Sequence, residues 1–255
     1  MNITIVAATG GVGRQILEQA EAAGHHVTAV VRNPAKLPAT RNGLRVVSVD
    51  LAAPGAAALQ SAIGGGDAVL SALGAVSAAE AGVAETGTRA IIRAMHATSV
   101  RRLIVVSAAP IGTVPSPGRP NPLKHDPGDG FFMRYLGAPF ARTAFGRQYA
   151  DLARMEDLIR DSDLDWTIMR PPGLIDRRLR GSYRVAIGCN VRGGVFISRP
   201  TWRTACWTRW IGLRPSGRRS VSPTEKSPRT SALLICSTSS PIALLQEPRH
   251  ISADL

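Results

Sequence analysis

The sequence predicts an α/β fold, a doubly wound parallel sheet with helices on both faces, in a single domain with an irregular C-terminal tail. Short apolar runs alternate with helix-like segments through the first two thirds of the chain. Nearly continuous apolar strands are typical of a parallel sheet that is buried on both faces. A Gly-rich turn joins the first run to the first helix. Right-handed crossovers then give the strand order 3-2-1-4-5.

The apolar runs at 2–6, 26–31, 44–49, 68–73, 102–107 and 165–169 are the expected strands. Helices are expected at 12–23, 54–63, 80–97 and 149–160, where the chain is rich in alanine or repeats apolar residues every three or four positions. Residues 33–42 predict a loop or a short helix. Residues 110–147 contain seven prolines and an apolar-aromatic group, so we expect a long loop there.

Composition excludes several classes of function. No apolar run approaches the roughly 20 residues that span a membrane, so the sequence predicts a cytoplasmic protein without a membrane partner. Three widely spaced cysteines indicate neither a disulfide framework nor a metal site. The net charge of +13 raises the question of nucleic acid. No zinc spacing, helix-turn-helix or aromatic-interleaved basic strand accompanies the charge, so we expect a small-molecule substrate instead. The oligomeric state stays open.

The first fourteen residues, MNITIVAATGGVGR, predict a dinucleotide site. A strand, a Gly-rich turn and a helix form a phosphate cradle, because glycines let the pyrophosphate approach backbone N–H groups at a helix N-terminus. Ala7 stands where the fingerprint usually begins with glycine, so the pattern is A-x-x-G-x-x-G. The alternative is a plain strand–helix turn.

Arg32 predicts a preference for NADP over NAD. An acidic residue usually ends the second strand of an NAD site, where it bonds the ribose 2′-hydroxyl. Here Arg32 holds that position, and Lys36 follows four residues later. A guanidinium suits a 2′-phosphate, which it can bind with two hydrogen bonds. The alternative is a solvated surface arginine.

Three further strand ends supply candidate contacts. Asp50 closes the third strand, where it could bond the adenine amino group or cap the next helix. The small residues of 71–74, Ser-Ala-Leu-Gly, could let the cofactor ribose lie against the backbone, or could simply end a strand. Ser107 ends the fifth strand and could bond a substrate carbonyl or the nicotinamide amide.

The usual Tyr-x-x-x-Lys pair is missing, because Ala153 follows Tyr149 where lysine would stand. Tyr149 is therefore either a catalytic hydroxyl or only a helix residue that packs on the core. Residues 110–147 have two interpretations as well. They form a lid or substrate wall, or they form a loop whose aromatic side chains cover the edge of the core.

Six motifs occur in order through residues 1–199, namely AATGGVG, VVRNPAKL, VDL, LSALG, VVSAAP and YADLARMEDLIRDSDLDWTIMRPPGLID. Together they resemble an atypical short-chain dehydrogenase/reductase of the NAD(P)H-binding, NmrA-like group, with a Rossmann-type fold. The functional type that the chain resembles within this group is biliverdin/flavin reductase B.

The resemblance implies an NADPH-dependent reductase that transfers a hydride to a flavin, quinone or other small acceptor. Such enzymes require no Tyr/Lys pair. The same group contains regulators that bind NADP without turnover, which is the alternative. Catalytic candidates are Ser107 and Tyr149. Cofactor contacts implied by the resemblance are Thr9, Gly10, Gly11, Val12, Gly13, Arg32, Lys36, Asp50, Leu51, Leu73, Gly74 and Ser107, with Pro171, Pro172, Gly173 and Leu174 at the nicotinamide end.

The tail at 200–255 is out of character with residues 1–199. Three of the four tryptophans fall at 202, 207 and 210, and the tail holds eight Lys or Arg against three Asp or Glu. One hypothesis is a shift of reading frame near Arg199, since the codons compatible with the tail allow an amphipathic helix in another frame. A frame-shifted tail would be poorly ordered. A genuine divergent tail and a disordered extension are the alternatives.

Overall fold

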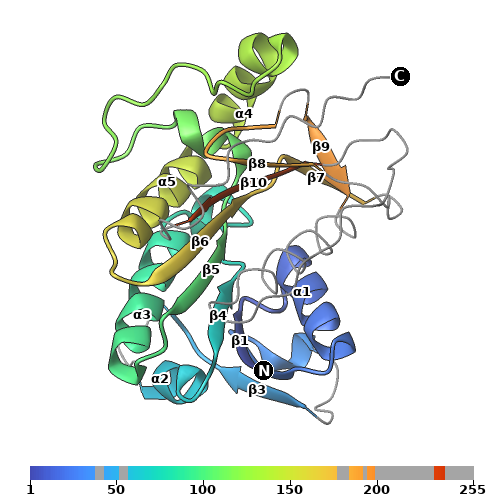
Figure 1. Ribbon diagram of the computed structural model, residues 1–255, viewed down its shortest axis with the longest axis vertical. Coiled ribbons are helices and arrows are strands. Elements are labelled where there is room, and N and C mark those ends of the chain that lie inside the picture. Colours follow the sequence, from blue (N-terminus) through green and yellow to red (C-terminus); the bar gives the residue numbers. More distant parts are fainter. Residues whose placement is uncertain (38–42, 52–56, 177–183, 192–193, 199–232, 239–255) are drawn as a thin grey trace, which may run out of the picture.

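A computed structural model describes residues 1–37, 43–51, 57–176, 184–191 and 194–198, together with the strand at 233–238. Figure 1 shows a central twisted sheet with helices on both of its faces. The α/β fold predicted from the sequence is confirmed.

The main sheet has the strand order β3-β2-β1-β4-β5-β6-β10-β8, so the predicted order 3-2-1-4-5 is confirmed. The neighbouring pairs from β3 to β6 are all parallel. The six predicted strands, β1 to β6, each lie within one or two residues of their predicted bounds, whereas β8 and β10 were not predicted. The strands of this sheet are β1 (Asn2–Val6), β2 (His26–Val31), β3 (Leu44–Ser48), β4 (Ala68–Ser71), β5 (Arg102–Val106), β6 (Asp165–Arg170), β8 (Arg184–Ile187) and β10 (Leu233–Thr238).

Helices bury one apolar cluster on each face of this sheet. On one face, Ile16 and Leu17 of α1 (Gly11–Ala22) pack on alternate residues of β1 and β2. On the other face, the cluster includes side chains from α2 (Ala57–Ile63), α3 (Val83–Thr98) and α5 (Gly146–Arg160). Figure 1 shows α1 on the side of the sheet opposite α2, α3 and α5. This arrangement exposes the carboxyl ends of the strands, where ligands of doubly wound sheets bind.

The prediction of a long loop at 110–147 is wrong in part. The segment contains the 3₁₀ turn η3 (Ala109–Thr113), the π-helical turn η4 (Met133–Gly137) and the helix α4 (Ala138–Ala144). Its prolines obscured this content. Pro139 is the second residue of α4 and follows directly on η4, so it lies where the helix changes from π to α hydrogen-bond spacing. Two further 3₁₀ turns lie elsewhere, at η1 (Pro34–Lys36) and η2 (Ala78–Glu80).

Two small strands follow the main sheet's sixth strand. They are β7 (Gly173–Ile175) and β9 (Phe196–Ser198), which pair in parallel. Within the tail, the structure describes the backbone of β10, which pairs antiparallel with β6 and parallel with β8. The rest of 200–255 lies outside the described residues, so the hypotheses about that tail stay predictions. In the described part of the chain, no helix is long and apolar enough to cross a membrane.

The side chain of Asp151 in α5 caps the N-terminus of α3. Its fully buried carboxylate accepts backbone N–H bonds from Ala84 at 3.0 Å and Glu85 at 2.9 Å, in the first turn of α3. The N-cap of α3 is Gly82, which has no side chain to serve this purpose. A residue distant in sequence therefore satisfies N–H groups that a helix leaves without partners, and its charge suits the helix dipole.

We expect Asp151→Ala to lower the free energy of unfolding by about 2–3 kcal/mol, because two buried N–H groups lose a charged acceptor. Urea denaturation measures this change. Asp161→Ala, at the exposed end of α5, should stay within about 0.5 kcal/mol of the wild type. Equal effects of the two substitutions would contradict the capping role.

Candidate functional site

A cavity of about 270 Å³ lies beside the carboxyl ends of β1, β2 and β4. Eight of the predicted cofactor contacts line it, so one site brings together residues from five separate stretches of sequence. They are Thr9, Gly10, Arg32, Lys36, Asp50, Leu51, Leu73 and Gly74. Other residues around it, among them Val76, Glu80 and Val83, were not predicted.

The Gly-rich turn contributes Ala7, Thr9 and Gly10 to the lining of this cavity, and its backbone is closely packed. Ala7 adopts a left-handed backbone conformation with φ of 61°, which suits glycine better than alanine. Gly13 packs so tightly that an added Cβ would lie 2.1 Å from the Ala7 carbonyl oxygen. The first turn of α1 carries no acidic residue and no side-chain cap. Its N–H groups are therefore suited to an anion.

Two cations and a carboxylate also line this cavity, namely Arg32, Lys36 and Glu80. The Arg32 guanidinium donates to Glu80 at 3.0 Å, and 68% of the Arg32 side chain is exposed. Arg14 of α1 donates to the Lys36 carbonyl oxygen at 3.1 Å, which holds η1 beside the turn. Arg32 is thus a largely exposed side chain with one acidic partner, so its role at a 2′-phosphate and the alternative of a solvated surface arginine both stay predictions.

The predicted adenosine contacts have different surroundings. Asp50 is exposed, whereas Leu51 packs against the core beside Leu73. Residues 52–56 lie outside the described residues, so the capping role considered for Asp50 stays a prediction. The Ser71 hydroxyl is buried and accepts the Leu73 N–H at 3.5 Å. An added Cβ on Gly74 would meet nothing within 4 Å, so the backbone there is open to a ligand.

The predicted nicotinamide contacts meet at the carboxyl ends of β5 and β6. The Ser107 N–H donates to Met169 O at 2.8 Å, and the Ala109 N–H donates to Pro171 O at 2.9 Å. Pro171 and Pro172 are buried. Leu174 packs against the same apolar cluster as Val12 of the Gly-rich turn. The Gly-rich turn and the segment 171–174 therefore pack against one apolar cluster.

The Ser107 hydroxyl is part of a buried ionic network. It donates to Glu156 Oε1 at 2.7 Å, and Arg170 Nε donates to the same oxygen at 2.8 Å. Glu156 Oε2 accepts from Arg160 at 2.5 Å and from a second nitrogen of Arg170. Glu156 is fully buried and Arg170 nearly so. All four donors face one carboxylate, which holds the ends of β5 and β6 against α5.

Opposing effects act on the pKa of Glu156. Burial raises it, but the hydrogen bond and charge of Arg170, the charge of Arg160 and the Ser107 hydrogen bond outweigh burial and lower it below its ordinary value. The carboxylate therefore stays ionised. With its proton directed at Glu156, the Ser107 hydroxyl is suited to accept a hydrogen bond from a ligand rather than to donate one.

Tyr149 packs against a small apolar cluster that includes Ile111 and Val114. Its ring lies 5.9 Å from that of Phe145, and burial raises the pKa of its hydroxyl. Ala153, where the missing lysine would stand, is completely buried. The catalytic role considered for Tyr149 stays a prediction.

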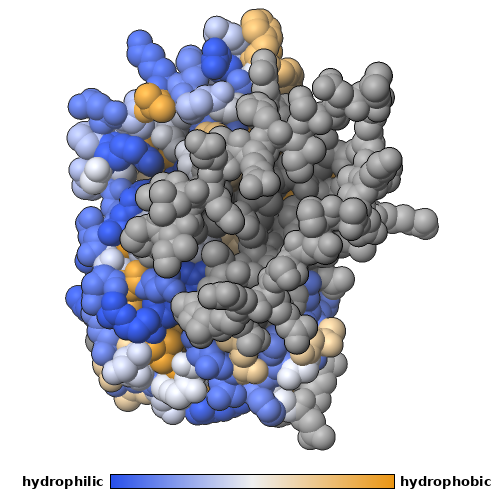
Figure 2. All heavy atoms as spheres, viewed as in Figure 1, coloured by the Kyte–Doolittle hydropathy of each residue, from blue (hydrophilic) through white to orange (hydrophobic). Residues whose placement is uncertain are grey.

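Large apolar side chains are exposed over the stretch 131–145. Five aromatic rings there are between 47% and 79% exposed, so they do not cover the edge of the core as one interpretation required. They are Phe131, Phe132, Tyr135, Phe140 and Phe145. Figure 2 shows apolar atoms at the top of the view, where Figure 1 places α4. α4 contacts η3, just after β5, and the interpretation of this segment as a substrate wall stays a prediction.

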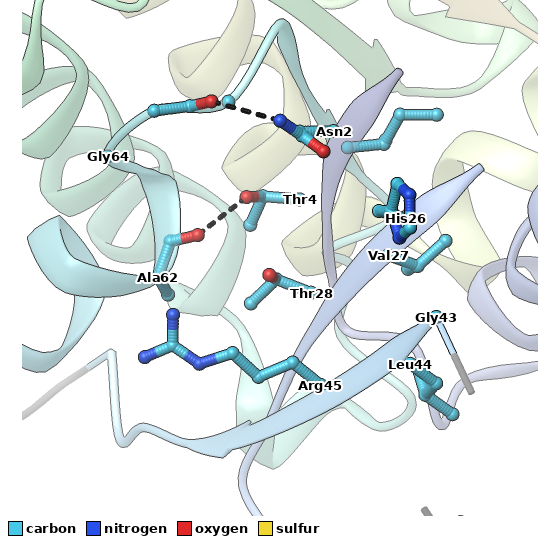
Figure 3. Close-up of a pocket in the computed structure, with 13 residues that line it drawn as sticks. Asn2, Thr4, His26, Val27, Thr28, Gly43, Leu44, Arg45, Ala62 and Gly64 are labelled. Carbon is cyan, nitrogen blue, oxygen red and sulfur yellow. Dashed lines mark hydrogen bonds between the residues drawn. The ribbon is translucent and has the colours of Figure 1, made fainter. Parts of the chain in front are cut away.

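A second cavity, of about 370 Å³, lies at the opposite, amino ends of β1, β2 and β3 (Figure 3). Its polar walls are occupied by internal hydrogen bonds. Thr4 donates to the Ala62 carbonyl oxygen at 2.8 Å, and Arg45 donates to the carbonyl oxygen and the hydroxyl of Ser61, each at 3.3 Å. None of the predicted site residues lines this cavity. Among the described residues, no three His, Cys, Asp or Glu side chains gather into a possible metal site.

Sequence reasoning missed the ionic partners of the site. Glu156 had a visible signal, because it lies on the apolar stripe of α5 with Leu152, Met155 and Ile159. An acidic residue on such a stripe requires a buried cation. Glu80 had no comparable signal, since no spacing relates it to Arg32, 48 residues earlier.

Comparisons with known proteins place the chain among dinucleotide-binding proteins. A family model described as NAD(P)H-binding matches residues 7–201. The uncharacterised protein YwnB of Bacillus subtilis is 27% identical over 208 residues, which cover 78% of this chain and 86% of YwnB.

Two solved structures share the fold. A short-chain dehydrogenase/reductase of Veillonella parvula in complex with NADP has a TM-score of 0.65 and 15% identity, over 92% of this chain and 94% of that one. ChuY of Escherichia coli O157:H7, described as an anaerobillin reductase, has a TM-score of 0.59 and 20% identity, over 92% and 97%.

We expect Gly13→Ala to weaken dinucleotide binding at least tenfold and to cost about 1–3 kcal/mol of stability, because the new Cβ would displace the Ala7 carbonyl. Calorimetric titration and thermal melts measure the two effects. Gly146→Ala, whose Cβ would meet nothing within 4 Å, is the matched control and should bind normally. Normal dinucleotide binding by Gly13→Ala would contradict a close approach of the ligand to the backbone of this turn.

Acid should weaken the fold through Glu156. Because the folded-state pKa of Glu156 is lowered, its contribution is present above its ordinary pKa of 4.5 and is lost as pH falls through the lower folded value. Glu156→Gln should cost about 3 kcal/mol near neutral pH, since Arg170 keeps its charge without its partner. It should also remove this part of the pH dependence.

Urea denaturation from neutral pH down to acid measures both effects. Glu18→Gln, on the exposed face of α1, should keep the wild-type profile. If the free energy of unfolding of Glu156→Gln falls with pH as steeply as that of the wild type, Glu156 is not the source of this pH dependence.

Proposed function

The chain belongs to the NAD(P)H-binding family, and we propose that it is an NADPH-dependent reductase that passes a hydride to a flat acceptor such as a flavin or quinone. The observation that carries this proposal is the cavity that joins the Gly-rich turn to Arg32 and Lys36. A phosphate cradle and two cations in the same cavity fit a dinucleotide with an additional 2′-phosphate.

The parts of the site have distinct tasks under this proposal. The N–H groups at the start of α1 bind the pyrophosphate, and Arg32 and Lys36 bind the 2′-phosphate. Asp50, Leu51 and the open backbone at Gly74 contact the adenosine half. The segment 171–174 holds the nicotinamide end. NADPH supplies the hydride when bound, and the protein supplies position and electrostatics.

Ser107 is a positioning group in this site rather than a proton donor. Its hydroxyl donates to Glu156, and this leaves its oxygen lone pairs to accept an N–H from the nicotinamide amide. The lack of a lysine at Ala153 argues against the reduction of ordinary carbonyl groups, which needs a proton delivered to the new alkoxide.

A flat, conjugated acceptor agrees with the surroundings of the site. Aromatic rings stack on flat ligands, and the exposed rings at 131–145 follow directly after the segment that leaves β5. The likeness of the fold to a protein described as an anaerobillin reductase is consistent with such an acceptor. We therefore propose a small-molecule acceptor and no nucleic-acid partner.

The second candidate is an NADP-binding regulator without turnover. Two observations favour it, namely the buried Ala153 in place of lysine and the engagement of the Ser107 proton by Glu156. In each case the site lacks a side-chain proton that could be given to a substrate. A regulator would bind NADPH and leave every acceptor unreduced.

We expect the purified protein to oxidise NADPH in the presence of FMN or menadione, as followed by the loss of NADPH absorbance. Ser107→Ala should lower kcat/KM about three- to tenfold, the effect of one neutral hydrogen bond. Ser162→Ala removes a hydroxyl at the far end of α5 and is the control. Tight NADPH binding without oxidation on either acceptor would favour the regulator instead.

A further inference from the structure

Glu80 is an acidic residue in the cofactor cavity that belongs to none of the sequence motifs. It ends η2, in the loop between β4 and α3, and lines the cavity with Arg32 and Lys36. Both of its carboxylate oxygens are engaged. Oε1 accepts from Arg32 at 3.0 Å, and Oε2 accepts the Val76 N–H at 3.0 Å. The carboxylate is thus held in place at the end of the cavity that Arg32 occupies.

The chemistry of this pair has opposite consequences for the two dinucleotides. A carboxylate accepts a hydrogen bond from a ribose 2′-hydroxyl, whereas a guanidinium binds a 2′-phosphate. Most sites offer one of these groups at the end of the second strand. This cavity offers Arg32 there and a carboxylate from a different loop, in direct contact with it.

A 2′-phosphate would therefore have to compete with Glu80 for the Arg32 guanidinium. It would also be repelled by the Glu80 carboxylate, because like charges at close range are unfavourable. A 2′-hydroxyl meets neither obstacle. The ion pair between Glu80 and Arg32 is partly exposed, with 68% of the Arg32 and 32% of the Glu80 side chain accessible, so breaking it costs little free energy. NADPH would still bind, but less tightly than Arg32 and Lys36 alone would allow.

We infer that Glu80 sets the preference between NADPH and NADH, holding it well below what Arg32 and Lys36 would give by themselves. This inference rests on the proposed function, since it assumes that the cavity binds a dinucleotide. It adds a specificity-determining residue outside the motifs that carry the family resemblance. The protein is accordingly a reductase that uses both dinucleotides, with NADPH only moderately favoured.

A purely structural role for Glu80 makes a different prediction. If Glu80 served only to hold the loop through the Val76 N–H, then glutamine, whose amide oxygen also accepts that bond, would change neither affinity. Glu80→Gln therefore separates the two roles, because it removes the negative charge and keeps the shape of the side chain.

The experiment measures Kd for NADPH and for NADH by calorimetric titration of the full chain. In Glu80→Gln, we expect tighter NADPH binding and weaker NADH binding, so that the NADH-to-NADPH ratio of Kd values rises about fivefold or more. Glu18→Gln removes the same charge from the exposed face of α1 and should leave the ratio unchanged. Thermal melts confirm that both variants are folded.

Arg32→Gln separates failure of the inference from failure of the proposed function. We expect it to weaken NADPH binding more than NADH binding. If it does, and Glu80→Gln leaves the ratio as in the wild type, the inference alone is overturned. If the wild type binds neither dinucleotide, the proposed function fails and the inference with it.

Discussion

The buried Glu156 carboxylate is the interaction on which the acceptor half of the site depends. A charge in the interior is tolerable only when it is paired and fully hydrogen-bonded. Arg170, Arg160 and Ser107 meet this requirement from β6, α5 and the end of β5. The same bonds set where Pro171 leaves the sheet and where the Ser107 hydroxyl points. The segment that we assign to the nicotinamide is therefore anchored by electrostatics rather than by apolar packing alone.

The adenosine half follows a different principle. It depends on backbone shape, because a left-handed Ala7 and a close-packed Gly13 bring the start of α1 up to the carboxyl end of β1. Its ionic groups are partly exposed, and Arg32 and Glu80 pair there in an ion pair that solvent weakens. Under our proposal, backbone shape positions the phosphates, and the charged groups Arg32, Lys36 and Glu80 discriminate between the dinucleotides.

Much of this arrangement could be predicted from the sequence, since it follows from local pattern. The six apolar runs gave strands close to their predicted bounds, and eight predicted contacts line one cavity. What could not be predicted depends on tertiary contact. Glu80 meets Arg32 only because β4 lies beside β1 and β1 beside β2. The helical content of 131–144 was hidden by the prolines that precede it and by Pro139, which lies at the junction of η4 and α4.

The contact of Asp151 with the start of α3 has a consequence beyond capping. α5 carries Glu156, which anchors the acceptor half, and Asp151, which grips Ala84 only four residues after Glu80. A second contact between α5 and α3 is the hydrogen bond that Arg154 donates to the Glu85 carboxylate at 2.6 Å. α5 thus connects the ends of β5 and β6 with the start of α3. Under our proposal, a shift of this helix under a bulky acceptor would move the start of α3 and with it the loop that carries Glu80, so the acceptor and the dinucleotide would be coupled through α5.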